Sequence, residues 1–424
     1  MKKIFYSFTI LSGFLLFFSC DNNNKEIDDP KEDPEEQPSA EVINLSADEM
    51  ANCYIVQQSG TYKFKADNQF NLGEGLPVPP EISPVRAELL WQTEKGLIKY
   101  VELEDGDTPY VVFEVTKAEG NAVIAVLNDK NEIEWSWHIW MPVERIEAVS
   151  LETGFEVMNM NIGALNNTPG DADSYGMLYQ WGRKDPFPAS PTVTGDTSTK
   201  GHPIYDINGN QIEITNSDWA NNENNTMEYS ISHPTVCLSN YSQFSVSRDW
   251  LSPENSDDSL WGNPRGEEKD KLNTPIYIGE KTCYDPSPAG WRVPPINVFS
   301  FFTESGGYAW TFEDFNVEDI NDDGIISLDD YNYGWHFIVN EGNSLFFPAA
   351  ARFDGSYAML MGSMSGLWGN YWSNAPSSSI AGGAMAVLAF QVKDQTGKEM
   401  ITVSPSAASS KADAFSVRCI KDYK

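Results

Sequence analysis

Short apolar runs separated by turn residues constrain the fold of this 424-residue chain more than any other feature. Seven runs occupy residues 54–56, 61–64, 87–91, 98–103, 110–115, 122–127 and 133–140. Runs of this length and spacing are typical of strands in a small all-β domain. Long stretches with the 3.6-residue apolar period of helices are scarce. We therefore predict a mostly β protein with an amino-terminal β-sandwich domain over residues 42–142.

The last of these runs has two faces. Its side chains alternate in two sets, with Trp135, Trp137 and Ile139 on one side and Ser136, His138 and Trp140 on the other. In a strand, such alternation places the sets on opposite faces of the sheet. We interpret one face as core and the other as a contact with a second domain, and a sugar-stacking platform of tryptophans is the alternative.

The amino terminus has the pattern of an export signal. Lys2 and Lys3 precede an apolar run over residues 4–18, and Ser19-Cys20 ends it. The run is shorter than a stable membrane span, and a small residue before cysteine resembles a bacterial lipobox. We predict a lipoprotein signal peptide over residues 1–19 and lipidation of Cys20. An ordinary signal peptide with an incidental cysteine is the alternative.

An acidic segment follows the signal. Residues 20–41 carry nine acidic side chains, three prolines and almost nothing apolar. Such a segment buries too little surface to offset its ordering entropy, so we predict a disordered, self-repelling tether. Acidic residues directly after the cysteine also resemble the surface-export signal of Bacteroidota lipoproteins. The predicted location is the outer membrane, lipid-anchored and facing outward, and a spacer that faces the periplasm is the alternative.

The formal net charge of −34 limits the partners. It argues against nucleic acid and against docking on anionic lipid, and it suits a protein able to hold divalent cations. No CxxC motif or Cys/His cluster occurs, which argues against a zinc site.

Residues 319–330 match the twelve-residue calcium loop. Gly324 stands at position 6, where the chain must turn sharply. The predicted Ca²⁺ ligands are, in loop order, Asp319, Asn321, Asp323, the carbonyl of Ile325, Ser327 through a water, and Asp330. Asp330 replaces the usual glutamate of position 12. Because a lone loop lacks the partner that sensors use, we predict one structural Ca²⁺; an acidic turn without metal is the alternative.

A series of motifs spans most of the chain. They occupy residues 159–164, 179–187, 288–294, 371–373 and 417–419, with further matches at 52–56, 120–126 and 135–140. This series resembles Bacteroidota surface lipoproteins with a Fibrobacter succinogenes major paralogous domain. That domain is related to the C-type-lectin-like fold of the formylglycine-generating-enzyme type. Asn159 and Met160 depart from the family pattern, which has Asp and Arg there.

The resemblance implies a loop-rich α+β C-type-lectin-like domain over residues 143–424. A polar insertion is expected near residues 190–257, with a hairpin at 204–214 whose Asn208-Gly209 suits a type I′ turn. Four cysteines besides Cys20 allow three pairings, and the resemblance favours a Cys283–Cys419 disulfide. Cys53 and Cys237 would then be free or buried.

The candidate reactive residues do not form a catalytic pattern. Four scattered histidines (His138, His202, His233 and His336) lack nucleophile partners in sequence. Trp181, Arg183 and Asp185 of the 179–187 motif, with Trp291, Arg292 and Trp372, are interpreted as packing residues that pin loops, with Asp185 able to accept a bidentate pair.

These observations predict a non-enzymatic surface lipoprotein for adhesion or for binding a glycan or a host or bacterial surface protein. A component of a fimbria-like assembly that contacts pilin subunits is the alternative, and an enzyme of unknown chemistry is less favoured.

Overall fold

The computed structural model describes residues 41–194, 199–217, 222–239, 248–263, 278–356, 359–377, 384–394 and 396–423. These residues belong to one compact unit, Glu41–Lys424. The predicted signal peptide, Cys20 and nearly all of the tether lie outside the described residues. In the described part of the chain, no helix has the length and apolarity needed to cross a bilayer.

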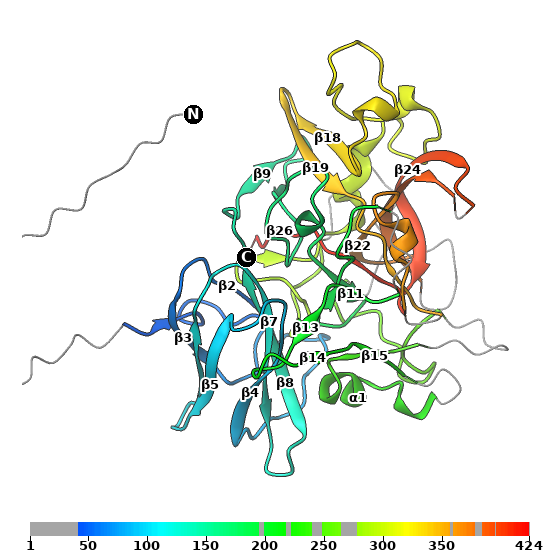
Figure 1. Ribbon diagram of the computed structural model, residues 1–424. Helices are drawn as coiled ribbons and strands as arrows, with labels where there is room; N and C mark the ends of the chain where they lie inside the picture. Colours follow the sequence, from blue (N-terminus) through cyan, green and yellow to red (C-terminus); the bar gives the residue numbers. More distant parts are fainter. Residues whose placement is uncertain are drawn as a thin grey trace, which may run out of the picture. The chain divides into compact units, whose positions relative to one another are not determined.

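All seven strands predicted in the amino-terminal part are present (Figure 1). They are β2 (Cys53–Ile55), β3 (Gly60–Lys65), β4 (Arg86–Gln92), β5 (Ile98–Glu104), β6 (Tyr110–Val115), β7 (Gly120–Leu127) and β8 (Ile133–Met141). One sheet has the order β1-β3-β6-β5, in which β1 is Ile43–Asn44. A six-stranded sheet has the order β14-β13-β4-β7-β8-β2, in which β13 is Ile204–Tyr205 and β14 is Gln211–Ile212.

The inward faces of these two sheets pack on each other. Strand β6 alternates buried and half-buried residues, as period 2 requires for a sheet with one covered face. The Phe64 ring of β3 lies 5.0 Å from the Trp137 ring of β8, centroid to centroid. Strand β7 is different, because every one of its residues is buried. Both faces of the central β7–β8 pair are therefore covered.

The predicted hairpin at residues 204–214 is confirmed, but its predicted turn type is wrong. A type I′ turn needs positive φ at both central residues, and only Gly209 of the Asn208-Gly209 pair has it, at 79°. Asp206 organises the turn instead, since its carboxylate accepts hydrogen bonds from the amides of Asn208 and Asn210. Tyr205 of β13 pairs with Gln92 of β4, so this part of the expected insertion extends the amino-terminal sheet.

The rest of the chain is mostly β as well. An eight-stranded sheet joins β12 (Phe187–Pro188), β11 (Met177–Gln180), β25 (Ala414–Ser416), β22 (Trp368–Pro376), β23 (Ala384–Lys393) and β24 (Glu399–Ser410), with β20 (Phe353–Asp354) and β21 (Met359–Leu360) at one side. A smaller sheet has the order β17 (Trp291–Arg292), β26 (Ile420–Lys421), β10 (Glu156–Met158) and β9 (Ala148–Ser150). Strands β18 (Gly334–Asn340) and β19 (Asn343–Pro348) form a hairpin, and β15 (Thr215–Asn216) pairs with β16 (Val236–Cys237). The helix α1 spans Met227–Ser232.

The largest hydrophobic core crosses the predicted domain boundary at residue 142. It runs from Phe64 and Trp137 to Trp181, Trp372 and Phe415 without a break. A second core surrounds Trp335 and Phe337 of β18. The amino-terminal sheets and the later strands therefore share one interior.

Candidate functional site

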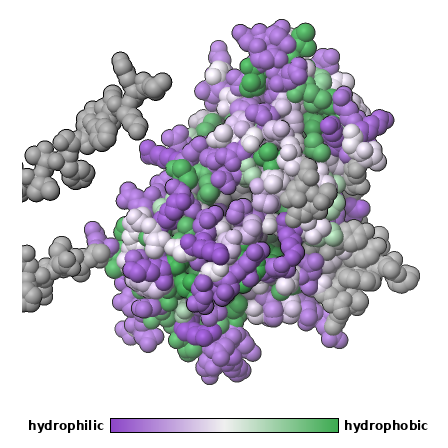
Figure 2. Space-filling view, viewed as in Figure 1, coloured by the Kyte–Doolittle hydropathy of each residue, from purple (hydrophilic) through white to green (hydrophobic). Residues whose placement is uncertain are grey.

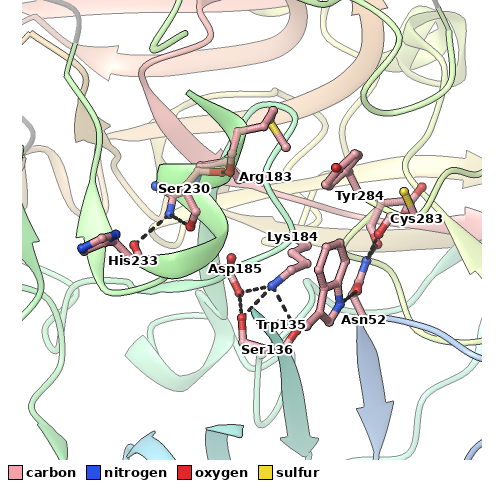
Figure 3. Close-up of polar contacts among 12 residues, drawn as sticks. Asn52, Trp135, Ser136, Arg183, Lys184, Asp185, Ser230, His233, Cys283 and Tyr284 are labelled. Carbon is pink, nitrogen blue, oxygen red and sulfur yellow. Dashed lines mark hydrogen bonds and ion pairs between the residues drawn. The ribbon is translucent and has the colours of Figure 1, made fainter. Parts of the chain in front are cut away.

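The outward face of β8 lies against residues 164–185, as the alternation in sequence predicted. The Ser136 hydroxyl donates to Asp185 Oδ1 at 2.5 Å, and Trp140 Nε1 donates to the carbonyl of Ala164 at 2.7 Å. Lys184 Nζ contacts Asp185 Oδ1 at 2.8 Å and donates to the carbonyl of Ser136 at 3.0 Å (Figure 3). We call these contacts the β8 seam.

The ion pair in the β8 seam is deeply buried. The side chains of Lys184 and Asp185 are 2% and 5% exposed. Burial lowers the pKa of Lys184, and the neighbouring Asp185 carboxylate acts in the opposite direction. Lys184 Nζ also lies 4.6 Å from the centre of the Trp135 ring, where a cation is attracted by the π face. The Asp185 carboxylate, the Ser136 carbonyl and the Trp135 ring thus all stabilise the positive charge of Lys184.

The Arg and Trp residues of the 179–187 motif have structural partners. Arg183 donates to the carbonyls of Ser230 and His233 at the end of α1 and to that of Val236 beyond it, so its cation caps a helix C-terminus (Figure 3). Trp181 Nε1 donates to the carbonyl of Ser373 at 2.9 Å. These contacts pin loops, as predicted. The acid of the motif differs from expectation, because Asp185 pairs with Lys184 and Ser136 rather than with an arginine.

A buried Cys-His-Asn arrangement crosses the β8 seam. His138 Nε2 lies 2.9 Å from Asn121 Oδ1, and its Nδ1 lies 3.1 Å from the Tyr179 hydroxyl and 3.6 Å from Cys53 Sγ. Asn121 Nδ2 donates to the carbonyl of Gly163, so we assign the proton to His138 Nε2 and make Nδ1 the acceptor.

Burial opposes a thiolate–imidazolium pair at this position. It lowers the pKa of His138 from 6.5 to about 3 and raises that of the Cys53 thiol well above its usual value. An activated cysteine requires the opposite shift of the thiol pKa. His138 is therefore a neutral strand residue that joins three strands, more fully buried than the sequence suggested.

The four cysteines of the described residues are free and buried. Cys419 donates to the Ser287 hydroxyl at 3.1 Å, while the Cys283 thiol lies 3.6 Å from the carbonyl oxygen of Pro77. The structure therefore gives Cys283 and Cys419 separate partners, and the disulfide implied by the family resemblance is not formed in it. Burial raises the pKa of Cys237 to about 12.

The predicted calcium loop folds around its own backbone amides. Asp319 Oδ2 accepts from the amide of Gly324 at 2.7 Å, and Asp323 Oδ1 accepts from that of Ile325 at 2.8 Å. Asp330 is 2% exposed and accepts from the amides of Ile320 and Ser327 with its two oxygens. Gly324 has φ of 81°, so the sharp turn falls at position 6 as predicted.

The donor types of this loop suit Ca²⁺, but their arrangement does not yet form a cage. Within the described residues, no three His, Cys, Asp or Glu side chains converge closely enough to hold a metal ion. Asn321 Oδ1 is likewise engaged, by the amide of Asp323.

A second loop of this region exposes two aromatic side chains. Tyr308 is 47% exposed and Trp310 is 71% exposed, and their rings lie 4.7 Å apart at 65° to each other. Ala309 between them is buried, and its amide and carbonyl pair with Val403 of β24. Side chains alternate along an extended segment, so the pairing of Ala309 with Val403 turns both neighbouring aromatic rings outward. We call residues 303–315 the aromatic loop.

The neck of the aromatic loop is held by hydrogen bonds. Asp314 accepts from the amide and the hydroxyl of Ser305 at 2.9 and 2.8 Å, and the amide of Glu304 donates to the carbonyl of Asp314. Sequence reasoning did not single out Tyr308 or Trp310. The signal was the Ser305-Gly306-Gly307 turn followed by aromatic residues at alternate positions.

One buried tryptophan connects the aromatic loop to the calcium loop. Trp335 is fully buried, and its ring contacts those of Phe312 and Phe315 at 6.2 and 5.8 Å. The Tyr331 ring also lies 4.9 Å from the Trp335 ring, centroid to centroid, and Tyr331 directly follows Asp330 in the sequence. A change at the end of the calcium loop therefore reaches the base of the aromatic loop through a single side chain.

Two hollows in the surface share His202. One has a volume of about 190 Å³ and is acidic, with Glu94, Glu119 and Asp173 in its wall. The other has a volume of about 370 Å³ and combines the apolar Phe353 and Met359 with polar residues of the β13–β14 region. His202 bonds through Nδ1 to the carbonyl of Pro203, so it is held by local backbone.

Comparisons with known proteins give no relative. No family model matches this chain, and no curated protein or solved structure is significantly similar to it.

We predict that Lys184→Met destabilises the protein by about 3–5 kcal/mol, because it leaves the Asp185 carboxylate buried without its cation. Lys99→Met is the matched control: it breaks an exposed pair with Glu114 and should cost at most about 1 kcal/mol. Denaturant unfolding of both variants measures the difference. Equal effects for the two variants would contradict a structural role for the buried pair.

The buried His138 predicts a pH dependence of stability. Its folded pKa is about 3 and its ordinary value is 6.5, so between these values only the unfolded chain takes up the proton. Its stabilising contribution is complete above about pH 6.5 and is lost on acidification, by up to about 1.4 kcal/mol per pH unit. We expect His138→Gln to flatten the slope of unfolding free energy between pH 6 and 5. The exposed His233→Gln should leave it unchanged, and equal slopes for all three proteins would refute the assignment.

The calcium loop predicts stabilisation by added metal. At ten times Kd, Ca²⁺ should add about 1.4 kcal/mol, which is roughly 1–3 °C in melting temperature, and EDTA should remove it. Replacing Asp319 and Asp323 together by Ala should abolish the response, whereas Asp129→Ala in the β7–β8 turn should keep it. Calorimetric titration without heat of binding at millimolar Ca²⁺ would leave only an acidic turn.

Proposed function

We propose that this chain is a non-enzymatic surface protein that binds glycans through the aromatic loop, as in adhesion. The observation that carries the proposal is the exposure of Tyr308 and Trp310, at 47% and 71%, on a loop that hydrogen bonds hold in place. Exposed aromatic faces on a rigid support provide a stacking surface at low entropic cost.

Single exposed apolar side chains are common on protein surfaces, but this pair differs in two respects. Both rings stand on one short loop. Hydrogen bonds fix the backbone of this loop, at its two ends through Asp314 and at Ala309 through Val403. Sugar rings combine an apolar CH face with hydroxyl groups, so an aromatic ring bordered by polar groups complements them. Glu304 and Glu313 of the same loop are exposed and supply hydrogen-bond acceptors.

The proposed architecture is a β-sandwich followed by a loop-rich C-type-lectin-like domain. The face-to-face packing of the two amino-terminal sheets supports the first part, and the order of the sequence motifs supports the second. The proposed location is the outer membrane, with Cys20 lipidated and the acidic tether holding the folded unit outward. The export signal ending at Ser19-Cys20 supports this location.

The proposed role of calcium is structural. A filled loop at residues 319–330 would fix the position of Tyr331, and Tyr331 packs on the same Trp335 that supports Phe312 and Phe315 of the aromatic loop. Ca²⁺ would thus stabilise the aromatic loop through Tyr331 and Trp335 rather than contact the ligand.

A glycan array probed with a soluble fragment from residue 42 tests this function. We expect binding to at least one glycan, and Trp310→Ala should weaken it about tenfold or more, as for an anchor residue at an interface. Val78→Ala is the control, because Val78 is 70% exposed on a different loop. Binding to no glycan, or binding that Trp310→Ala leaves intact, would refute the proposal.

A further inference from the structure

We infer that the aromatic loop recognises a single uncharged hexopyranose at the end of a glycan. This inference rests on the proposed glycan-binding function and specifies its ligand. Ring geometry and local charge support it independently.

The two exposed rings form a corner rather than a platform. Their planes meet at 65° with centroids 4.7 Å apart, so they cannot both stack on one flat surface. A flat crystalline polysaccharide surface is matched by coplanar rings, which this pair does not offer. Rings at this separation contact each other edge to face, so a single sugar ring would lie with its CH face on the outer face of Trp310 and its edge beside Tyr308. The geometry therefore favours a terminal residue over an extended chain.

The charge around the corner is negative. Residues 299–316 contain Glu304, Glu313 and Asp314 and no lysine or arginine. Glu304 and Glu313 are exposed, and hydrogen bonds to the Glu313 carboxylate, first from its own backbone amide and then from the Thr311 side chain, lower the pKa of Glu313 and keep it ionised. An anionic sugar, such as a uronate or sialate, would be repelled by the carboxylates of this loop and by the overall charge of −34. A neutral sugar instead donates its hydroxyl protons to them.

The tip of the loop leaves room for a ligand beside the rings. Gly307 is exposed, and a side chain added there would meet only the Ser305 hydroxyl, at 3.8 Å. The amide and carbonyl of Gly307 already bond to the hydroxyls of Ser305 and Thr303, so the glycine offers open space for a ligand rather than free backbone groups. Figure 2 shows a mainly hydrophilic visible face with separate hydrophobic patches.

The test is inhibition of glycan binding by single sugars, measured with the fragment from residue 42. The probes are methyl glycosides of glucose, galactose, mannose and N-acetylglucosamine, with glucuronic acid, sialic acid and insoluble cellulose and chitin as comparisons. We expect at least one neutral methyl glycoside to inhibit and to change tryptophan fluorescence, an effect lost in Trp310→Ala. The two acidic sugars should bind at least about tenfold more weakly.

Charge variants separate the inference from the function. Glu304→Gln with Glu313→Gln should reduce the discrimination against acidic sugars, whereas Asp129→Asn in the β7–β8 turn should not. Preference for acidic sugars, or binding to cellulose or chitin without inhibition by any methyl glycoside, would overturn the inference while the loss in Trp310→Ala still upholds glycan binding. Binding to no glycan at all would instead refute the proposed function.

Discussion

The structure depends on the burial of a polar strand face. Ser136, His138 and Trp140 of β8 point away from the amino-terminal core, and all three are buried. A buried polar group without a partner costs about 1–3 kcal/mol, so each of these side chains needs a specific acceptor or donor. The partners come from residues 164–185, which places that segment against β8. The β8 seam thus joins the early strands to the later sheet.

This arrangement explains why the most distinctive motif of the sequence lies inside the molecule. Arg183, Lys184 and Asp185 are all nearly inaccessible to solvent. Arg183 donates to backbone carbonyls, Lys184 and Asp185 pair with each other, and the lysine also lies over an aromatic ring. Charges in such positions fix one arrangement of loops because an alternative would leave them unpaired. A fixed interior of this kind supports the outer loops, and one of these loops carries the exposed aromatic pair.

The aromatic loop is held in place by contacts within the loop and with other elements. Trp335 lies beneath it, Asp314 closes its neck and Val403 of β24 holds Ala309. Together these contacts hold the backbone of the loop that carries Tyr308 and Trp310. The same tryptophan receives Tyr331 from the calcium loop, so the two loops share one support.

The sequence by itself determined the strands and their faces. Apolar runs bounded by turn residues located all seven amino-terminal strands, period-2 alternation located the contact face of β8, and the glycine at position 6 located the sharp turn of residues 319–330. These features depend on neighbours in sequence, which is why local patterns reveal them.

Only the tertiary structure decided which groups meet. Asp185 is paired by Lys184, Cys419 lies beside Ser287 rather than in a disulfide with Cys283, and Trp310 is exposed while Trp335 is buried. Alternation says that two side chains share a face, but it does not say what packs opposite them. That choice is made by segments tens of residues away in the chain, such as β24 against Ala309 and residues 164–185 against β8.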